Sequence, residues 1–311
     1  MTGGWGFGGA GIGSLGAPVD DATARATVDA AWEAGVRSFD TAPHYGLGLG
    51  ERRLGAALAG RPREEFRVST KVGRLLVEAA DEQDDLPVGG FAVRTRTRRA
   101  WDLSADGAHR SLAASRERLG LDRIDTAFVH DPEEHDLHAG LTGALAALAA
   151  MRERGEVAEI GVGSKSVPTL LAAARTGLVD VLMVAGRCSL LDPSAATELL
   201  PLCADRGVAV IAAGVFNSGA LSRDVPERAL PYEYGPMPVA MWARLERLAA
   251  VCRAHDVPLP VAALAFPRRL PAVREIVIGV QSPGQVAEND ARFAASVPDA
   301  LWADLAEEGL L

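Results

Sequence analysis

Short apolar segments recur along the chain, and stretches with apolar residues at helical spacing separate them. Brief runs rich in β-branched residues, bounded by glycine or polar residues, are typical of buried strands. We therefore predict eight strands, at Trp5–Gly8, Val36–Asp40, Phe66–Lys71, Ile124–His130, Ala158–Gly163, Val179–Val184, Val208–Ala213 and Glu275–Gly279.

The predicted helices end at glycines, which commonly stop helices. They span Asp21–Ala34, Ala105–Leu119, Leu141–Arg154 and Ser194–Arg206, and glycines 35, 120, 155 and 207 follow them. Because a strand follows each glycine within a few residues, the pattern indicates parallel βαβ units. Eight such units predict an α/β fold, a single (β/α)8 TIM barrel domain over residues 1–311. Two further helices, Val239–His255 and Pro298–Glu308, are expected outside the barrel wall.

An open, doubly wound sheet is the alternative. The segment Gly8–Gly16 is rich in glycine, and Gly11–Gly16 matches the GxGxxG pattern of dinucleotide-binding sheets. Asp40, at the end of the second predicted strand, matches the acidic residue that such a site uses for ribose. The regular repetition to eight strands favours the closed barrel.

Two longer connections stand out between the predicted elements. Val72–Leu103 has mixed charge, and Gly214–Val239 is rich in Gly, Pro and Tyr. We expect both to be loops at the carboxyl-terminal face of the barrel, where barrel active sites form.

Composition limits the partners of the chain. The net charge of −9 and the pI of about 5.3 argue against nucleic acid or an anionic membrane as a partner. There is no apolar run of membrane-spanning length and no leader pattern, so we expect a cytoplasmic protein. The three cysteines, Cys188, Cys203 and Cys252, match no metal spacing, and we expect no metal.

Four polar residues lie at or just after the ends of consecutive predicted strands. Asp40 ends the second strand, Tyr45 follows five residues later, Lys71 ends the third and His130 the fourth. Adjacent strand ends meet at one barrel mouth. An ammonium beside a phenol favours the phenolate, so Lys71, held by Asp40, can prepare Tyr45 for proton transfer. His130 can donate a hydrogen bond to a substrate oxygen.

These motifs resemble the aldo-keto reductases, and the resemblance covers nearly the whole chain. It rests on Phe39–Gly46 followed by Glu51–Gly55, and on Ser69–Gly73, Val129–Pro132, Gly161–Gly163, Gly214–Gly219 and Gln285–Asn289. Within the family the chain is most similar to the branch of sugar and pyridoxal dehydrogenases. That similarity rests on Arg123–Asp125, Leu190–Asp192, Pro201–Cys203 and Leu301–Trp302.

The resemblance implies a (β/α)8 barrel, an NAD(P) cofactor and a catalytic tetrad of Asp40, Tyr45, Lys71 and His130. It also implies one difference in the fold. Relatives usually carry a hairpin before the first strand that closes the barrel floor, and we expect this chain to lack it.

The expected cofactor site lies in the connections after the last strands, where barrels often bind phosphate. The candidate residues are Ser164, Lys165, Phe216, Ser218, Gly219, Gly279, Gln281, Ser282, Gln285, Glu288 and Asn289. Many relatives that prefer NADP carry Arg or Lys at positions like Gln281 and Gln285. Because a 2′-phosphate needs a charged partner, we expect NAD to be preferred, or weak discrimination.

Two positions on the nicotinamide side depart from the family pattern. Lys165 stands where relatives commonly have Asn, and Cys188 stands where they have an aromatic residue that stacks on the nicotinamide ring. We interpret both as tolerated drift, while altered cofactor geometry is the alternative.

The tetrad predicts an enzyme that transfers hydride between nicotinamide and a small carbonyl or alcohol, an aldose or similar polar molecule. His44, Trp101, Tyr232 and Tyr234 are candidate substrate contacts. Two alternatives stay open: a reductase of a specialised biosynthetic pathway, and a non-catalytic nucleotide-binding barrel. The sequence leaves the direction of reaction open, as well as the choice between a monomer and a small homo-oligomer.

Overall fold

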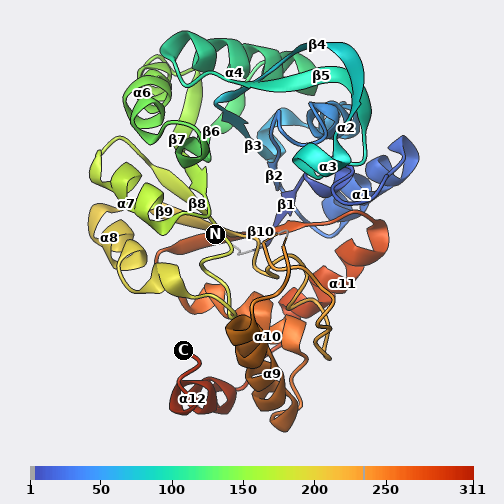
Figure 1. The fold of residues 1–311 in the computed structure, drawn as a ribbon, viewed down its shortest axis with the longest axis vertical. Helices are drawn as coiled ribbons and strands as arrows, with labels where there is room; N and C mark the ends of the chain where they lie inside the picture. Colours follow the sequence, from blue (N-terminus) through green and yellow to red (C-terminus); the bar gives the residue numbers. More distant parts are fainter. Residues whose placement is uncertain (1–3, 234) are drawn as a thin grey trace.

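Eight parallel strands form a closed barrel in the computed structural model, which describes residues 4–233 and 235–311 (Figure 1). The strands are β1 (Gly6–Gly8), β2 (Ser38–Asp40), β3 (Arg67–Val72), β6 (Ile124–His130), β7 (Val157–Ser164), β8 (Val181–Ala185), β9 (Ala209–Ala213) and β10 (Val273–Gly279). They follow one another around the barrel in chain order. β1 closes the ring by pairing with both β2 and β10.

Every predicted strand overlaps one barrel strand, which confirms the predicted fold class. The carboxyl-terminal ends of the strands lie within one residue of the predicted ends. This agreement matters for function, because those ends carry the candidate catalytic residues. β1 is the first strand in the described part of the chain.

The glycine-rich segment after β1 has a different role from the one that an open sheet would give it. Gly11–Gly13 forms one turn of 3-10 helix. A side chain at Gly11 would overlap the carbonyl oxygen of Val280, and one at Gly13 would press on the backbone of Tyr45. The GxGxxG match is therefore explained by close backbone packing, and the open-sheet alternative is wrong.

Helices surround the barrel. They are α1 (Asp21–Glu33), α2 (Leu49–Leu58), α4 (Ala105–Leu119), α5 (Leu137–Ala139), α6 (Ala146–Glu153), α7 (Val167–Arg175), α8 (Leu199–Arg206), α10 (Leu259–Ala265) and α11 (Pro283–Ala294). Several begin at a side-chain cap: Asp20 accepts from Thr23 N, and Ser104 from Gly107 N. α9 (Val239–Ala254) and α12 (Asp299–Glu307) pack with α10 in a second core cluster below the barrel in Figure 1.

The helix predicted at Leu141–Arg154 is interrupted. Residues Gly140–Leu145 form a π-helical turn between α5 and α6. A side chain at Gly140 would overlap Pro132, and one at Gly143 would overlap the carbonyl oxygen of Leu103. The two glycines therefore allow this turn to lie against the neighbouring connections.

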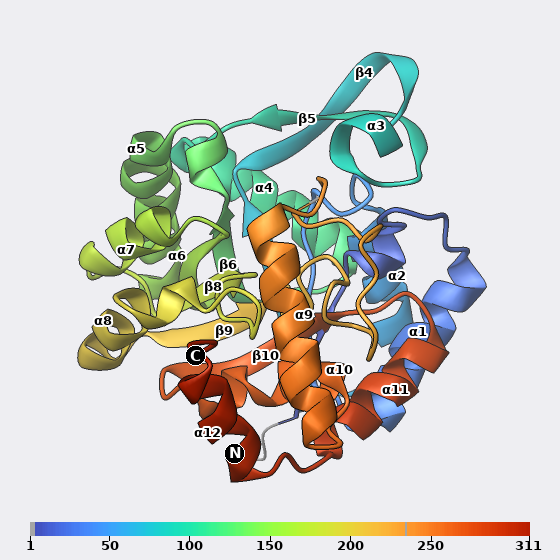
Figure 2. The same cartoon turned by 60° about the horizontal axis from the view of Figure 1, so that its bottom comes forward.

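The expectation that Val72–Leu103 is a loop is wrong. β4 (Arg74–Asp84) and β5 (Arg94–Trp101) pair as an antiparallel sheet, with α3 (Leu86–Gly89) between them. This hairpin rises above the barrel mouth (Figure 2). The many charges indicated a loop, but the arginines and threonines of β5 alternate with the period of a strand. The connection between β9 and α9 forms turns without a strand or helix among its described residues, as predicted.

No single helix in the described ranges is long and apolar enough to span a membrane. Only α9 taken together with Leu259–Arg269 meets the length and composition limits, and that pair is bent by 100°.

Candidate active site

Lys71 and Asp40 form a buried ion pair at the barrel mouth. The Nζ atom of Lys71 lies 2.6 Å from Asp40 Oδ2 and donates to the carbonyl oxygen of Thr41 at 2.9 Å. Ser69 donates to the other carboxylate oxygen at 2.6 Å. Burial alone would lower the pKa of Lys71, but Asp40, and then Tyr45, raise it above its ordinary value. Lys71 therefore remains a cation although its side chain is only 2% exposed.

Tyr45 lies beside this cation. Its ring comes from the turn after β2, and Lys71 Nζ lies 4.7 Å from the ring centroid. The ring centroid of His130 is 6.0 Å from that of Tyr45, and Phe91 lies at the same distance. The structure thus brings the predicted tetrad together at one mouth.

Two imidazoles flank the phenol. His130 ends β6, and burial, together with the charges of Arg74 and Lys71, holds the pKa of His130 well below its ordinary value. Burial and the charge of Arg99 lower the pKa of His44 to about 2. The ring centroids of His44 and His130 lie 5.7 Å apart. Both rings are therefore neutral at physiological pH.

His44 carries a buried nitrogen, Nδ1, without a hydrogen-bond partner in the described part of the chain. Arg99 of β5 fixes the main chain at this point, since it donates to the carbonyl oxygen of His44 at 2.8 Å and is paired with Asp85.

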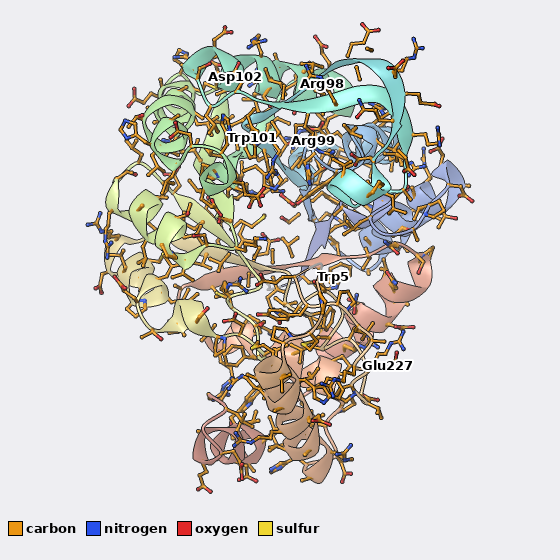
Figure 3. The ribbon with its side chains drawn as sticks, viewed as in Figure 1. Trp5, Arg98, Arg99, Trp101, Asp102 and Glu227 are labelled. Carbon is orange, nitrogen blue, oxygen red and sulfur yellow. The ribbon has the colours of Figure 1, made fainter. Side chains whose placement is uncertain are left out.

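Arg74 is a buried part of the site that the sequence analysis did not single out. Its Nη1 lies 3.2 Å from His130 Nδ1, and its Nη2 lies 3.1 Å from Asp131 Oδ2 and 2.6 Å from Glu134 Oε2. Figure 3 shows Trp101, over whose ring the guanidinium carbon lies at 4.4 Å, on the side of β5 that faces the barrel. The sequence feature that could have identified Arg74 is its position, three residues after Lys71.

Asp131 was also missed. It directly follows His130, and its backbone is left-handed, with φ 43°. Burial raises the pKa of Asp131 to about 6, and the nearby carboxylates of Glu134 and Glu133 act in the same direction against Arg74.

The candidate substrate contacts have different surroundings. Trp101 is covered by Arg74 and stacks on His135, with ring centroids 5.3 Å apart. The hydroxyl of Tyr232 already donates to Asp192 Oδ2 at 3.1 Å, and its ring packs against the second core cluster. Tyr234 lies outside the described residues.

The candidate cofactor residues lie after β7, β9 and β10. Ser164 is buried and donates to Glu133, whereas Lys165 is exposed. After β9, Phe216 is half-buried, and Ser218 and Gly219 follow with positive φ. After β10, Ser282 caps α11, and Gln285 accepts from the backbone of Gln281 at 2.8 Å. Gly279 and Glu288 are exposed, while Asn289 is buried.

Asn217 is a further candidate in the connection after β9. Its Nδ2 donates to the carbonyl oxygen of Gly186, while its buried Oδ1 has no partner in the described part of the chain. Gly279, at the end of β10, has open space where a side chain would stand. An unpaired acceptor and open backbone at the strand ends fit a ligand with N–H donors.

Cys188 follows the end of β8 by three residues. It is buried in the main core cluster, where burial raises the pKa of its thiol to about 12. Residues 4–233 and 235–311 contain no group of three or more His, Cys, Asp or Glu side chains placed to hold a metal ion.

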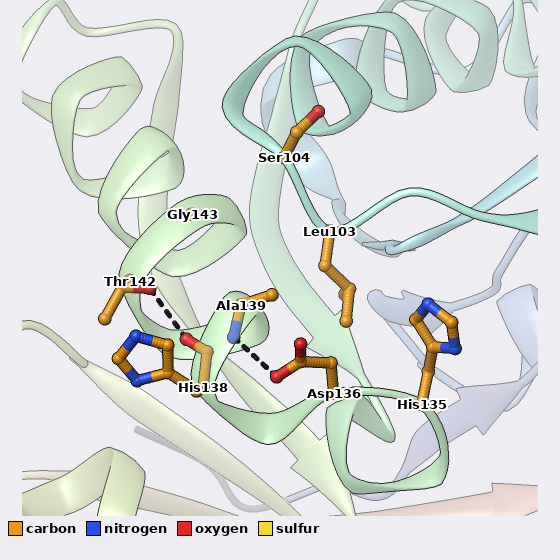
Figure 4. A pocket seen from close by; sticks show the side chains of 8 residues that line it. All are labelled: Leu103, Ser104, His135, Asp136, His138, Ala139, Thr142 and Gly143. Carbon is orange, nitrogen blue, oxygen red and sulfur yellow. Dashed lines mark hydrogen bonds between the residues drawn. The ribbon is translucent and has the colours of Figure 1, made fainter.

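A separate hollow of about 350 Å³ lies between the start of α4 and α5 (Figure 4). Two of its polar side chains are engaged within the protein: Asp136 accepts from Ala139 N at 2.9 Å, and Thr142 donates to the carbonyl oxygen of His138 at 2.8 Å. We therefore place the candidate site at the barrel mouth.

Barrel and site together define the class of protein. The pattern of the Aldo/keto reductase family matches residues 3–307, and the chain belongs to that family of oxidoreductases. Enzymes of this family use NAD(P)(H).

Two curated relatives match almost the whole chain. A D-threo-aldose 1-dehydrogenase from a Pseudomonas species is 48% identical, with 98% of this chain and 94% of the relative covered. A pyridoxal 4-dehydrogenase from Microbacterium luteolum is 38% identical with the same coverage. These are the two activities of the branch that the sequence resembles.

Solved structures confirm the fold. An aldo-keto reductase from Bacillus halodurans in its holo form superposes with a TM-score of 0.73 at 24% identity, covering 98% of this chain and 91% of the other. A glycerol dehydrogenase from Gluconobacter oxydans gives 0.72 at 19% identity, covering 97% and 90%.

Proposed function

We propose that the chain is an NAD(P)-dependent dehydrogenase that transfers hydride between the cofactor and a small polar carbonyl or alcohol, with Tyr45 as general acid and base. The observation that carries this proposal is the buried ammonium of Lys71, paired with Asp40 and 4.7 Å from the ring centroid of Tyr45. A free phenol has a pKa near ~10, too high for rapid proton exchange at neutral pH. A cation held beside it favours the phenolate.

His130 works with Tyr45 in the proposed proton transfer. Since His130 is neutral, it offers one ring N–H to an oxygen on the reacting carbon and stabilises the charge that develops there. Tyr45 then gives a proton to that oxygen during reduction, or takes one from it during oxidation. Asp40 keeps Lys71 in place in both directions.

The cofactor, when bound, supplies or accepts the hydride. The residues after β9 and β10 fit it, because Asn217 Oδ1 suits an N–H donor and the capped start of α11 suits an anionic group. Gln281 and Gln285 provide no cation for a 2′-phosphate. We therefore assign a preference for NAD, or weak discrimination between the two nucleotides.

An aldose is the substrate class that we favour. The relative with 48% identity is a D-threo-aldose 1-dehydrogenase. The neutral ring of His44 lies beside the proposed reacting groups, with centroid distances of 6.2 Å to Tyr45 and 5.7 Å to His130, so it is a candidate neighbour of the substrate.

The test is nicotinamide absorbance with a panel of aldoses, aldehydes and ketones, run in both directions with NAD and with NADP. We expect turnover with at least one aldose. Tyr45→Phe should lower kcat by roughly 10²- to 10⁴-fold, the range for one general acid–base group, while it leaves cofactor affinity intact. A Tyr45→Phe enzyme with most of its activity would contradict the mechanism. Tight cofactor binding without turnover on the whole panel would favour a non-catalytic barrel.

A further inference from the structure

We propose that Arg74 is a positioning residue that fixes the tautomer of His130, so that Nε2 carries the ring proton and points it at the reacting oxygen. The inference rests on the proposed function of His130 as a hydrogen-bond donor. It adds a residue that the motifs of the catalytic strands do not contain.

The guanidinium of Arg74 is fixed from several sides. Asp131 and Glu134 accept from Nη2, and the flat face lies over Trp101. The side chain is only 7% exposed. The remaining nitrogen, Nη1, lies 3.2 Å from His130 Nδ1. The protein alone therefore sets the position of Nη1, whether or not substrate is bound.

The chemistry of the pair allows one arrangement. A guanidinium carries donors only and stays protonated in proteins. Nδ1 of His130 must therefore accept from Arg74. A neutral imidazole that accepts at one nitrogen carries its proton on the other, so His130 is held as the Nε2–H form.

That proton is available to a ligand. Asp131 Oδ2 lies 3.4 Å from Nε2, longer than a normal N–H···O bond, and the same oxygen is engaged by Arg74. A substrate oxygen can replace so weak a contact. Without Arg74, the ring is free to carry its proton on Nδ1, and Nε2 would then turn a lone pair towards the substrate oxygen and repel it.

The backbone explains why this residue reaches His130. Gly73 precedes Arg74 with φ 112°, a conformation that other residues rarely adopt. The chain leaves the barrel there, and Asp102 N donates to the carbonyl oxygen of Gly73 at 2.9 Å. The first residue of the hairpin is thus directed across the end of β6.

The test reads the tautomer directly, from the ring nitrogen chemical shifts of ¹⁵N-histidine-labelled protein without substrate. His130→Gln identifies the signals of His130 among the six histidines. Wild-type protein at pH 7.5 should show a protonated Nε2 and an unprotonated, hydrogen-bonded Nδ1. Arg74→Met and Arg74→Gln should shift His130 towards a mixture of the two neutral forms. Glu134→Gln is the matched control, because its amide oxygen can still accept from Arg74, and the tautomer should stay.

Kinetics supply the second readout. We expect Arg74→Met to lower kcat by roughly 10- to 100-fold, below the 10²- to 10³-fold typical of removing a transition-state donor outright. KM for the cofactor should change little, because the partners that the described residues offer Arg74 are His130, Asp131, Glu134 and Trp101, none of which is a candidate cofactor residue. Arg74→Lys, which keeps a donor-only cation, should recover part of the lost kcat.

Two results would overturn the proposal: a wild-type His130 that is charged or protonated at Nδ1 at pH 7.5, or Arg74 variants that keep the wild-type tautomer. The wild-type spectrum decides the first even if a variant fails to fold. Because the spectra need no turnover, an inactive protein with the expected tautomer would contradict the proposed function and leave the control of the His130 tautomer by Arg74 standing.

Discussion

Asp131 combines an unusual backbone conformation with an unusual environment. Its φ of 43° lies in the left-handed region, which Asp and Asn tolerate best among residues with a side chain. The side chain is 20% exposed, and its partial burial raises the pKa to about 6 even though Arg74 lies 3.1 Å away. Burial and the neighbouring glutamates therefore outweigh the attraction of the arginine.

The raised pKa of Asp131 predicts how the stability of the folded protein depends on pH. The folded protein holds a proton on Asp131 up to pH ~6, whereas an unfolded aspartate releases it near pH ~4. Between these values the folded state binds more protons, so the contribution of Asp131 to stability falls as pH rises. Asp131→Asn has no proton to lose, and it should be more stable than wild type at pH 7.5 by up to about 3 kcal/mol.

Urea unfolding at pH 4.5 and at pH 7.5 measures this difference. The advantage of Asp131→Asn should shrink towards zero at the lower pH. Asp131→Ala serves as the comparison, because alanine removes the same charge but costs about 1–2 kcal/mol in the left-handed backbone. An Asn variant less stable than wild type at both pH values would show that the ion pair with Arg74 dominates instead.

Single residues also mark how far the sequence could predict the site. Asp40, Tyr45, Lys71 and His130 are readable, since each follows or ends a predicted strand and has chemistry of its own. Arg74 contacts the site only because a hairpin begins at Gly73. Asp131 looks like an ordinary loop aspartate until its burial is known. The pattern of hydrophobic and polar positions does not predict contacts that depend on how a connection folds back over the barrel.

At the scale of elements, the barrel strands were predictable and the β4–β5 hairpin was not. Barrel strands are buried on both faces and are continuous apolar runs, as Ile124–His130 illustrates. β5 is exposed on one face and only half-buried on the other, so its strand period is carried by arginine and threonine. Hydrophobicity alone does not detect a strand of this kind.

Close packing between β7 and β8 predicts that two glycines of β7 differ in how well they tolerate a side chain. A side chain at Gly161 would overlap the carbonyl oxygen of Val181, its register partner, whereas one at Gly163 would meet Met183 at an ordinary 3.6 Å. Gly161→Ala should lower the free energy of unfolding by at least about 2 kcal/mol, and Gly163→Ala by less than about 1 kcal/mol. Urea unfolding of the matched pair checks this. Equal losses would mean that the two strands can move apart.

At the scale of the whole molecule, the proposed cofactor residues join connections that are far apart in sequence. They follow β7, β9 and β10, so a ligand across them would link the barrel wall to α11. A ligand that binds only the folded state raises the free energy of unfolding of the entire cooperative unit.

Thermal unfolding with nucleotide therefore tests the proposed cofactor site. NAD at 100 times its Kd should add about 2.7 kcal/mol of stability, which amounts to several degrees in Tm. NADP at the same concentration should give a smaller or similar shift, because Gln281 and Gln285 carry no charge. Tyr45→Phe is the control and should keep the full shift. A Tm increase with NADP alone would contradict the predicted nucleotide preference.

The β4–β5 hairpin above the barrel mouth also affects how copies of the protein meet at high concentration. β4 and β5 form a two-stranded sheet, and neither outer edge has a strand partner in the described ranges. Exposed Arg94, Arg96 and Arg98 follow one edge, and Asp81, Glu82 and Asp84 the other. Two copies that joined through the same edge would set like charges against each other. Charge along these edges thus opposes the pairing of two copies through the same edge of the hairpin.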